Sequence, residues 1–347
     1  MADFADRLAA VRDLLGRLVA QDSLPGAAIA VAVDGELVFE HYEGDAAPGR
    51  PAAADTLWDL ASIGKTYTAA TITALVERGI LTFSRPVEAV LPACTGGGRE
   101  RITLRHLLTH TAGLDGDAPE VARLRAANAP LEAIVDAVLN APLSFAPGTD
   151  RRYGDLGSAV AAQVAVRATG TPFPDLLRTL VLEPGELHDT FRPLPRSEAN
   201  RLAHVAGVYS ADPFDAVDPA ADVRATVCDL LRFGLLFAPG GPRILSEAGV
   251  RVMTTDQTGR DFYDAADNDT IYAQAIGFVL KGRPGLRELA GTRVFGHVGS
   301  TGCLLWVDPA ERVAGAFASN LDVGLDDLYF RLDRVANVTT AALTRRH

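Results

Sequence analysis

Cysteine is scarce in this chain, and the few cysteines lie far apart. Cys94, Cys228 and Cys303 are the three cysteines among 347 residues, and no C-x-x-C pair occurs. Zinc ribbons and thioredoxin-like redox sites are therefore excluded, because both need closely spaced cysteine pairs. Scattered single cysteines are typical of a reducing compartment, where disulfides do not persist.

Positively charged residues are also fewer than negatively charged ones. The chain has 33 Lys and Arg against 44 Asp and Glu, which gives a net charge of −11. Nucleic acids require a basic face and anionic lipids attract basic segments, so we expect neither as a partner. The net charge says little about a substrate, because the field inside a site can oppose the field of the whole chain.

Long apolar runs are absent too. No stretch of about 18 uncharged apolar residues occurs, so no transmembrane helix is expected. The first twenty residues, MADFADRLAAVRDLLGRLVA, carry acids and arginines throughout. They lack the unbroken apolar core of a secretory signal. The simplest expected location is the cytoplasm.

Several common catalytic motifs are missing. The sequence has no G-x-S-x-G nucleophile elbow, no H-E-x-x-H zinc motif and no G-x-G-x-x-G nucleotide motif, and its seven histidines are dispersed. Gly64-Lys65-Thr66 resembles the end of a phosphate-binding P-loop, but Asp59 stands where that loop requires its first glycine. We therefore expect no metal and no organic cofactor.

The N-terminal part does contain clear periodic segments. Apolar residues recur at helical spacing over 3–20, which predicts a helix. Two apolar runs flank Asp34-Gly35, and both turn residues tolerate positive φ, which predicts a β-hairpin. A long buried helix is expected from about 62 to 77, with Gly79 as its stop.

The rest of the chain changes character twice. Residues from about 100 to 265 read mainly as helices and loops, and four short runs rich in Val, Phe and Trp then predict antiparallel strands before a last helix. A lone hairpin is unstable, so the N-terminal hairpin should join the C-terminal strands in one sheet. The expected organisation is an α/β sheet domain of 1–60 plus 266–347 and a mainly helical domain of 61–265, with the site in the cleft between them.

Ser62 and Lys65 stand three residues apart at the start of a predicted helix, so they share a face and can touch. Free N–H groups in a first helical turn can hold a developing oxyanion. The helix dipole and burial would lower the pKa of the lysine, and a neutral lysine could accept the serine proton. Alone the pair is weak evidence, because a first-turn serine is usually an N-cap.

Four segments together resemble one known family. LWDLASIGKTYTAATITALVERGILTFSRPVEAVLP is similar to the nucleophile helix of class C β-lactamase-like serine hydrolases. ITLRHLLTHTAGL, FAPGTDRRYGDLGSAV and FGHVGSTGCLLWVDP are similar to the family's His-Thr-Ser-Gly-Leu, Tyr-x-Asn and Lys/His-Thr-Gly segments, in the family's order. The resemblance covers about residues 25–320. It implies an α+β, transpeptidase-like fold with an antiparallel sheet flanked by helices and an inserted all-helical region.

The resemblance also implies roles for individual residues. Ser62 matches the acylated nucleophile, and Lys65 matches the lysine that assists removal of its proton. Tyr153 matches the tyrosine that relays the proton to the leaving group, unless it is an ordinary packed tyrosine. Arg151 and Arg152 adjoin Tyr153 in the sequence, and two cations facing a phenol would favour its phenolate.

Asp155 departs from the family pattern, which has Asn at this position. An amide can donate to a substrate carbonyl, whereas a carboxylate cannot. Two alternatives follow for Asp155. It could pair with Lys65 and hold it charged, which would shift the role of base to Tyr153. It could instead cap the helix that begins at Leu156.

The third motif reads His297-Val298-Gly299. By the resemblance, the N–H groups of Ser300 and Ser62 form the oxyanion hole, and Gly299 allows close backbone approach. Val298 replaces a hydroxyl residue that helps β-lactamases and peptidases of the family to bind a substrate carboxylate. The alternative for this segment is a plain glycine-rich turn.

Three further features carry weaker expectations. His110 lies in the THTAGL segment, which in the family supports the cleft and does not act as a base. Cys303 is expected to be packed on a strand and unreactive. Tyr209 and the loop at 212–218 fall where substrate-facing loops are expected.

The sequence therefore predicts a serine hydrolase or acyltransferase that acts through an acyl-enzyme on a small ester or amide, most simply a carboxylesterase-like enzyme. The family includes class C β-lactamases, DD-peptidases, D-aminopeptidases, family VIII carboxylesterases and acyltransferases. β-Lactamase or D-amino acid amidase or peptidase activity is one alternative, and a binding protein that has lost turnover is another. A cytoplasmic location would argue against cell-wall peptidase work, because that substrate lies outside the membrane.

Overall fold

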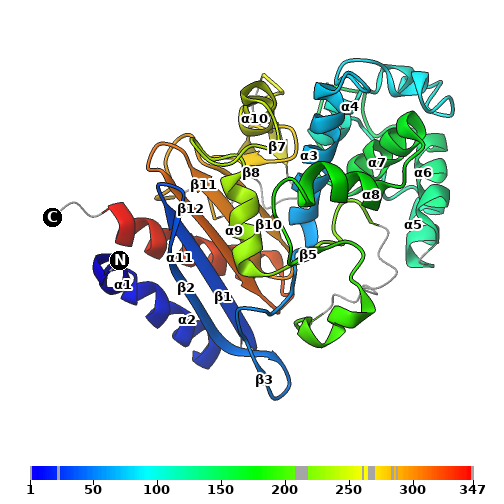
Figure 1. The fold of residues 1–347 in the computed structure, drawn as a ribbon. Helices are drawn as coiled ribbons and strands as arrows, with labels where there is room; N and C mark the ends of the chain where they lie inside the picture. The colour runs from blue at the N-terminus through cyan, green and yellow to red at the C-terminus, as the bar shows by residue number, and fades with distance from the viewer. Residues whose placement is uncertain are drawn as a thin grey trace.

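A seven-stranded antiparallel sheet forms the centre of the molecule (Figure 1). This computed structural model describes residues 2–21, 24–127, 129–207, 218–259, 262–264, 270–282, 285–286 and 288–344. The strand order is β3-β2-β1-β12-β11-β10-β9. The strands are β1 Gly26–Val33, β2 Glu36–Ala47, β3 Arg50–Pro51, β9 Val279–Leu280, β10 Phe295–Gly299, β11 Cys303–Asp308 and β12 Val313–Ser319.

The two ends of the chain meet in this sheet. β1 and β2 form the predicted hairpin, whose turn residues Asp34 and Gly35 have φ of 54° and 86°. β1 then pairs with β12, with Ala27 opposite Ser319, so the predicted union of the N-terminal hairpin with the C-terminal strands is confirmed. The fold is the α+β arrangement that the sequence predicted.

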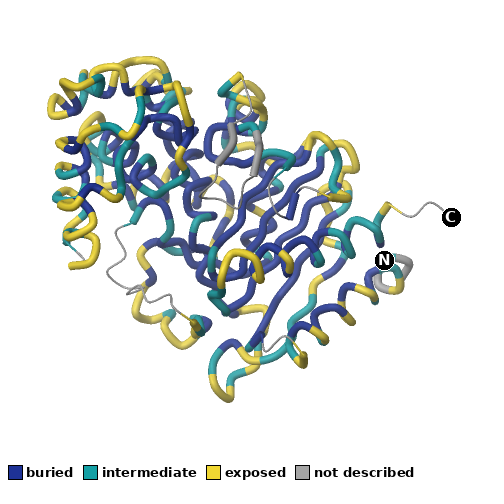
Figure 2. The backbone as a smooth tube through the Cα atoms, turned by 180° about the vertical axis from the view of Figure 1, so that it is seen from behind, coloured by how far each residue is buried: buried dark blue, intermediate teal, exposed yellow. Residues whose placement is uncertain are grey.

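Helices cover both faces of the sheet. α1 Ala2–Arg7, α2 Ala9–Gln21 and α11 Leu325–Thr344 lie on one side, and α9 Val227–Leu235 packs against β12, β11 and β1 on the other (Figure 1). Figure 2 shows the central strands β1, β10, β11 and β12 buried between these layers, with exposed residues on the outer helices and loops. β2, nearer the edge, is mostly half-buried or exposed. The helix predicted over 3–20 is broken at Leu8, which is itself fully buried.

A block of helices lies beside the sheet, built around α3. Its main helices are α3 Gly64–Glu77, α4 Leu104–Leu108, α5 Pro119–Ala126, α6 Leu131–Asn140, α7 Leu156–Thr169, α8 Phe173–Leu177 and α10 Glu247–Thr254. Nearly all of α3 is buried, and it packs against α7. Its four threonine hydroxyls donate to backbone carbonyls, which is how a polar sequence is tolerated in the core.

Two smaller sheets complete the fold. β4 Trp58–Asp59, β6 Arg224–Ala225 and β5 Thr190–Phe191 form one, and β7 Phe262–Asp264 pairs with β8 Thr270–Tyr272 in the other. The predicted domain boundaries stay a prediction, and α9, which falls inside 61–265, packs on the main sheet. Within the part of the chain that the structure describes, no helix combines the length and apolar character needed to span a membrane.

Candidate active site

The segment from 59 to 64, which we call the Ser62 turn, carries the predicted nucleophile. Strand β4 leads into a single 3₁₀ turn, Ala61–Ile63, and α3 begins directly after it. The buried carboxylate of Asp59 accepts a hydrogen bond from the N–H of Ala61 at 3.0 Å and pairs with buried Arg224 at 2.9 Å. Ala61 has φ of 44°, a strained conformation for a residue with a Cβ.

Backbone presses against backbone on both sides of this turn. A Cβ on Gly64 would overlap the carbonyl oxygen of Ala221, and a Cβ on Gly299, at the end of β10, would overlap the carbonyl oxygen of Leu60. Thr301 follows β10 and donates from Oγ1 to the carbonyl of Asp59 at 2.6 Å. The Ser62 turn is therefore held by close main-chain contacts at Gly64 and Gly299, where a side chain would not fit, and by the hydrogen bonds of Asp59 and Thr301.

Lys65 is the second residue of α3, and its side chain is 2% exposed. Its Nζ is 2.8 Å from Ser62 Oγ and 2.7 Å from Asp155 Oδ1. Burial alone would lower the pKa of Lys65, but the Asp155 carboxylate and Tyr153 outweigh it and raise that pKa above its ordinary value. The expected lowering by burial and helix dipole does not prevail, and Lys65 is an ammonium.

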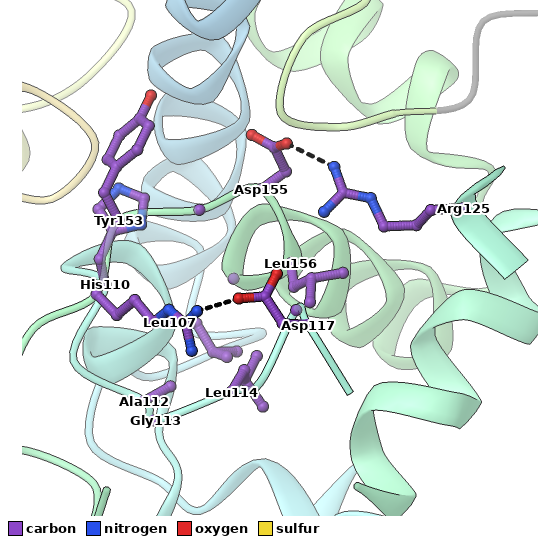
Figure 3. A pocket seen from close by; sticks show the side chains of 14 residues that line it. Leu107, His110, Ala112, Gly113, Leu114, Asp117, Arg125, Tyr153, Asp155 and Leu156 are labelled. Carbon is purple, nitrogen blue, oxygen red and sulfur yellow. Dashed lines mark hydrogen bonds and ion pairs between the residues drawn. The ribbon is translucent and has the colours of Figure 1, made fainter. Parts of the chain in front are cut away.

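Asp155 bridges two cations. Its Oδ1 faces Lys65, and its Oδ2 accepts a hydrogen bond from Arg125 Nη2 at 3.0 Å (Figure 3). The Lys65 ammonium lowers the pKa of Asp155 to about 2 against the effect of burial, with a smaller contribution from Arg125. Asp155 occupies the N-cap position of α7, but its side chain makes no cap hydrogen bond. Of the two alternatives, the pairing with Lys65 is the one present.

The phenol ring of Tyr153 is surrounded by cations and imidazoles. Lys65 Nζ lies 4.9 Å from the ring centre, and Arg151 Cζ lies 5.8 Å from it. The rings of His110 and His297 are 4.7 and 6.3 Å away. Tyr153 thus lies beside Lys65, whose Nζ also contacts Ser62 Oγ, and the catalytic roles of the three residues stay a prediction.

The two arginines beside Tyr153 point in different directions. Arg151 is buried and donates to Gln274 Oε1 at 3.2 Å. Arg152 is exposed and pairs with Asp115 at 3.3 Å and with Asp117. Only Arg151 therefore adds positive charge behind the phenol.

Strand β10 places its residues on opposite faces of the sheet. The ring of His297 faces Tyr153, whereas Val298 belongs to the apolar cluster that includes residues of α2 and α11. The side chain of Val298 therefore lies away from Ser62, because successive strand residues alternate between faces. Cys303, on β11, is fully buried, and burial raises its thiol pKa to about 11.

His110 supports the site from the side. It follows α4, has φ of 60° and lies with its ring against that of Tyr153. Its carbonyl accepts a hydrogen bond from the N–H of Arg152 at 3.0 Å. His110 thus connects the end of α4 to the segment that carries the tyrosine.

Two further charged residues belong to the site. Arg125, on α5, had no motif to identify it, and Asp218, in the segment that crosses the start of α3, is the described end of the loop that was expected to face the substrate. Burial and then the Asp155 charge raise the pKa of Asp218 to about 6, although Lys65 opposes this. The loop predicted to face the substrate falls outside the described residues at Tyr209 and at 212–217.

A cavity of about 230 Å³ opens beside Tyr153 and Asp155 (Figure 3). Its wall combines apolar and glycine backbone surface with four ionic side chains. The lining residues are Leu107, His110, Ala112, Gly113, Leu114, Gly116, Asp117, Arg125, Arg152, Tyr153, Gly154, Asp155, Leu156 and Gly157. Across the described ranges, no group of three or more His, Cys, Asp or Glu side chains is placed to hold a metal ion.

Comparisons with known proteins identify the family and the fold. The family model described as Beta-lactamase matches residues 11–340. The chain is 35% identical over 205 residues to Esterase EstB of Burkholderia gladioli, and the match spans 54% of this chain and 51% of the esterase. It is 29% identical over 324 residues to Penicillin-binding protein 4 of Amycolatopsis lactamdurans, which spans 86% and 81% of the two chains.

A solved structure resembles the whole chain. The penicillin-binding protein homolog from Caulobacter crescentus superposes with a TM-score of 0.80 at 25% identity, and the match covers 96% of this chain and 98% of that one. The match to the esterase is more local, because this chain spans about half of the esterase's length.

Proposed function

This chain belongs to the β-lactamase family of serine hydrolases, and within that family we propose that it is a carboxylesterase-like enzyme that forms an acyl-enzyme on Ser62. The observation that carries the proposal is the position of Lys65 Nζ, which contacts Ser62 Oγ and Asp155 at once. A buried ammonium beside a serine hydroxyl stabilises negative charge on that oxygen when it attacks a carbonyl.

Because Lys65 is charged, the proton acceptor in this proposal is Tyr153. In its phenolate form Tyr153 takes the Ser62 proton while Oγ bonds to the ester carbonyl carbon. Lys65 Nζ and Arg151 Cζ lie 4.9 and 5.8 Å from the ring centre, so two cations are near the phenol that takes the proton. The carbonyl oxygen becomes an oxyanion, held by the N–H groups of Ser62 and Ser300.

The remaining steps use the same groups in reverse. Tyr153 gives the proton to the leaving alkoxide oxygen as the ester C–O bond breaks, which leaves the acyl group on Ser62. Water then attacks the acyl carbonyl and gives a proton to Tyr153. The acid departs as Ser62 Oγ regains that proton, and the enzyme returns to its starting state.

Asp155 supports an ester over a β-lactam or peptide as the substrate. Both of its carboxylate oxygens are engaged by cations, and it offers no N–H donor. A substrate with an amide carbonyl beside Asp155 would place two acceptors against each other. A plain alkyl or aryl ester has no such group, and the similarity to Esterase EstB favours the same class.

The test is intact-mass analysis and turnover with p-nitrophenyl esters, nitrocefin and D-amino acid amides. We expect ester turnover with an acyl mass increase on Ser62, and far slower reaction of the other two donors. Ser62→Ala should lower ester turnover by about 10³-fold or more. Ser300→Ala should retain most activity, because the proposed role of Ser300 uses its backbone N–H.

Full turnover by Ser62→Ala would disprove the assignment of the nucleophile. Faster reaction of nitrocefin or the amides than of the esters would replace the esterase proposal with one of the other family activities. No turnover and no adduct with any donor would favour a fold that only binds.

A further inference from the structure

A second and larger cavity, of about 750 Å³, lies at the edge of the sheet where β9 and β10 meet α10 and the end of α9. β10 contributes Phe295 to this cavity and Gly299 to the Ser62 turn. At about 3.3 Å per residue, roughly 13 Å of strand separates the two places. The cavity shares no lining residue with the one beside Tyr153.

The inner surface of the large cavity is apolar. Phe237, Val250, Val294 and Phe295 are buried residues of its wall, and Leu280 adds a half-buried side chain. A volume of several hundred Å³ with apolar walls is the size range of small-molecule sites. The cavity can therefore accommodate an alkyl or aryl group.

Four cations surround this apolar surface. Arg243, Arg251, Lys281 and Arg293 line the cavity, and Glu247 is the one carboxylate in its lining. None of the four cations forms an ion pair with a carboxylate anywhere in the described part of the chain. In a protein with a net charge of −11, the cavity thus carries a local charge of the opposite sign.

Two of the four cations are held in place by hydrogen bonds to neutral carbonyl groups. Arg243 Nη1 donates to the carbonyls of Leu236 and Ala238 at 3.1 and 2.7 Å. Lys281 Nζ donates to the carbonyl of Glu288 at 3.1 Å. Carbonyl oxygens orient these side chains but carry no formal charge, so the positive field remains.

The cavity beside Tyr153 is built in the opposite way. Its lining cations are Arg125, which pairs with Asp155, and Arg152, which pairs with Asp117. Both cations that line that cavity therefore already have an anion. Like charges that gather without anions repel one another, and an incoming anion would relieve that repulsion.

We propose that the large cavity binds an organic anion with an apolar body, of the class of alkyl or aryl carboxylates. The carboxylate would lie between Arg251 and Arg293, which are exposed at the rim, and the apolar body against Phe237 and Phe295. Such acids are also what an ester hydrolase releases. The proposal nevertheless rests on the residues of the cavity and not on the reaction at Ser62.

The test is isothermal titration of the Ser62→Ala protein with octanoate and with octanamide, its neutral isostere. The Ser62→Ala background prevents turnover of the amide. We expect octanoate to bind at one site and octanamide to bind roughly tenfold more weakly, because an ionised acceptor strengthens hydrogen bonds to arginine. Added salt should weaken octanoate binding and leave octanamide binding unchanged.

A matched pair of double variants then locates the site. Arg251→Gln with Arg293→Gln should weaken octanoate binding roughly tenfold and leave octanamide binding unchanged. Arg17→Gln with Arg167→Gln makes the same change of charge at exposed positions on α2 and α7 and should have no effect. All four side chains are exposed, so both double variants should keep the thermal midpoint of the parent.

Two results would overturn the proposal. One is equal binding of octanoate and octanamide, which would indicate a purely apolar site. The other is octanoate binding that survives loss of Arg251 and Arg293 but disappears when Ser62 of the native enzyme is blocked by a phosphonate. That outcome would place the acid in the cleft at Ser62, and it would leave the proposed esterase activity standing.

Discussion

The Ser62 turn and the charged cluster around it, formed by Lys65, Arg125, Asp155 and Asp218, are held by different kinds of contact. Main chain lies against main chain on both sides of the turn. The cluster is held by side chains that reach across from α3, α5 and two loops. The first arrangement fixes the position of Ser62, the proposed nucleophile, and the second influences which side chains carry a proton. Damage to the turn should therefore cost more than damage to any one charge.

Of four substitutions that test this comparison, Gly299→Ala should lower the rate of ester hydrolysis the most, because the added Cβ would overlap the carbonyl oxygen of Leu60. The end of β10 would move away from the Ser62 turn and carry the N–H of Ser300 with it. A displacement near 1 Å at a reacting centre lowers the rate about 100-fold. Steady-state hydrolysis of a p-nitrophenyl ester measures the loss. Gly16→Ala is the control and should leave the hydrolysis rate unchanged, because a Cβ at Gly16 meets no atom within 4 Å.

Asp155→Asn should cause the next largest loss of activity and should change the pH dependence of the acylation rate. Burial lowers the pKa of Lys65, and without the opposing carboxylate that pKa should fall below its native value. The acylation rate, followed by stopped flow across the alkaline range, should then show a titration that the native enzyme lacks. Loss of a charge-assisted hydrogen bond should slow acylation about tenfold at neutral pH. Asp117→Asn, at an exposed ion pair, should keep the native profile.

Arg125→Gln should have a smaller effect, since Lys65 alone already keeps Asp155 ionised. The pKa of Asp155, about 2 in the native protein, should rise but stay below neutral. Ion pairs of exposed residues contribute up to about 1 kcal/mol, so we expect acylation to change by about two- to fivefold. Arg123→Gln breaks a surface pair with Glu120 on the same helix and serves as the control. A loss as large as that of Asp155→Asn would mean that Arg125 has a more direct role.

Asp218→Asn should have the smallest effect of the four substitutions. We expect this effect in the thermal stability of the protein. The folded protein holds the pKa of Asp218 at about 6, above the ordinary value near 3.9, so folding is favoured while Asp218 is protonated. That contribution is lost as the pH rises through about 6. The variant stays neutral, so its thermal midpoint should match the native one at pH 4 and exceed it by about 2 °C at pH 8.

Scanning fluorimetry at the two pH values measures this difference. Asp13→Asn, at an exposed position on α2, should give no pH-dependent difference. An Asp218→Asn variant with the same midpoint difference at both pH values would mean that Asp218 keeps an ordinary pKa.

Local patterns predicted most elements of the fold, because they depend on neighbouring residues. The Asp34-Gly35 hairpin, the C-terminal strands and the last helix lie where period and turn residues placed them. The break at Leu8 was not predicted, since apolar residues continue at helical spacing across it. The place of α9 on the sheet could not be predicted either, because a helical pattern does not say what its apolar face meets.

The sequence likewise predicted some features of the site and not others. Motif spacing and the family resemblance predicted that Ser62, Lys65 and Tyr153 come together. The charge of Lys65 could not be predicted, because burial and a carboxylate shift its pKa in opposite directions and the balance depends on distances. Arg125 was missed because no local signal marks it. Asp218 ends the loop that was expected to face the substrate, but nothing in the sequence indicated its charge interactions with Asp155 and Lys65. Val298 was expected to influence the substrate, although the alternation of β10 directs its side chain to the other face.

The pairing of β1 with β12 has a consequence for how the protein is made. Ala27 meets Ser319, so a ribosome must add about 290 residues before β1 finds its partner strand. At about 5–20 residues per second, the first hairpin waits roughly 15–60 s with one edge open. That edge, GAAIAVAV, is apolar and uncharged, which is the composition of an aggregation-prone strand. The nascent hairpin is therefore the segment most exposed to wrong strand pairing until the last strands emerge.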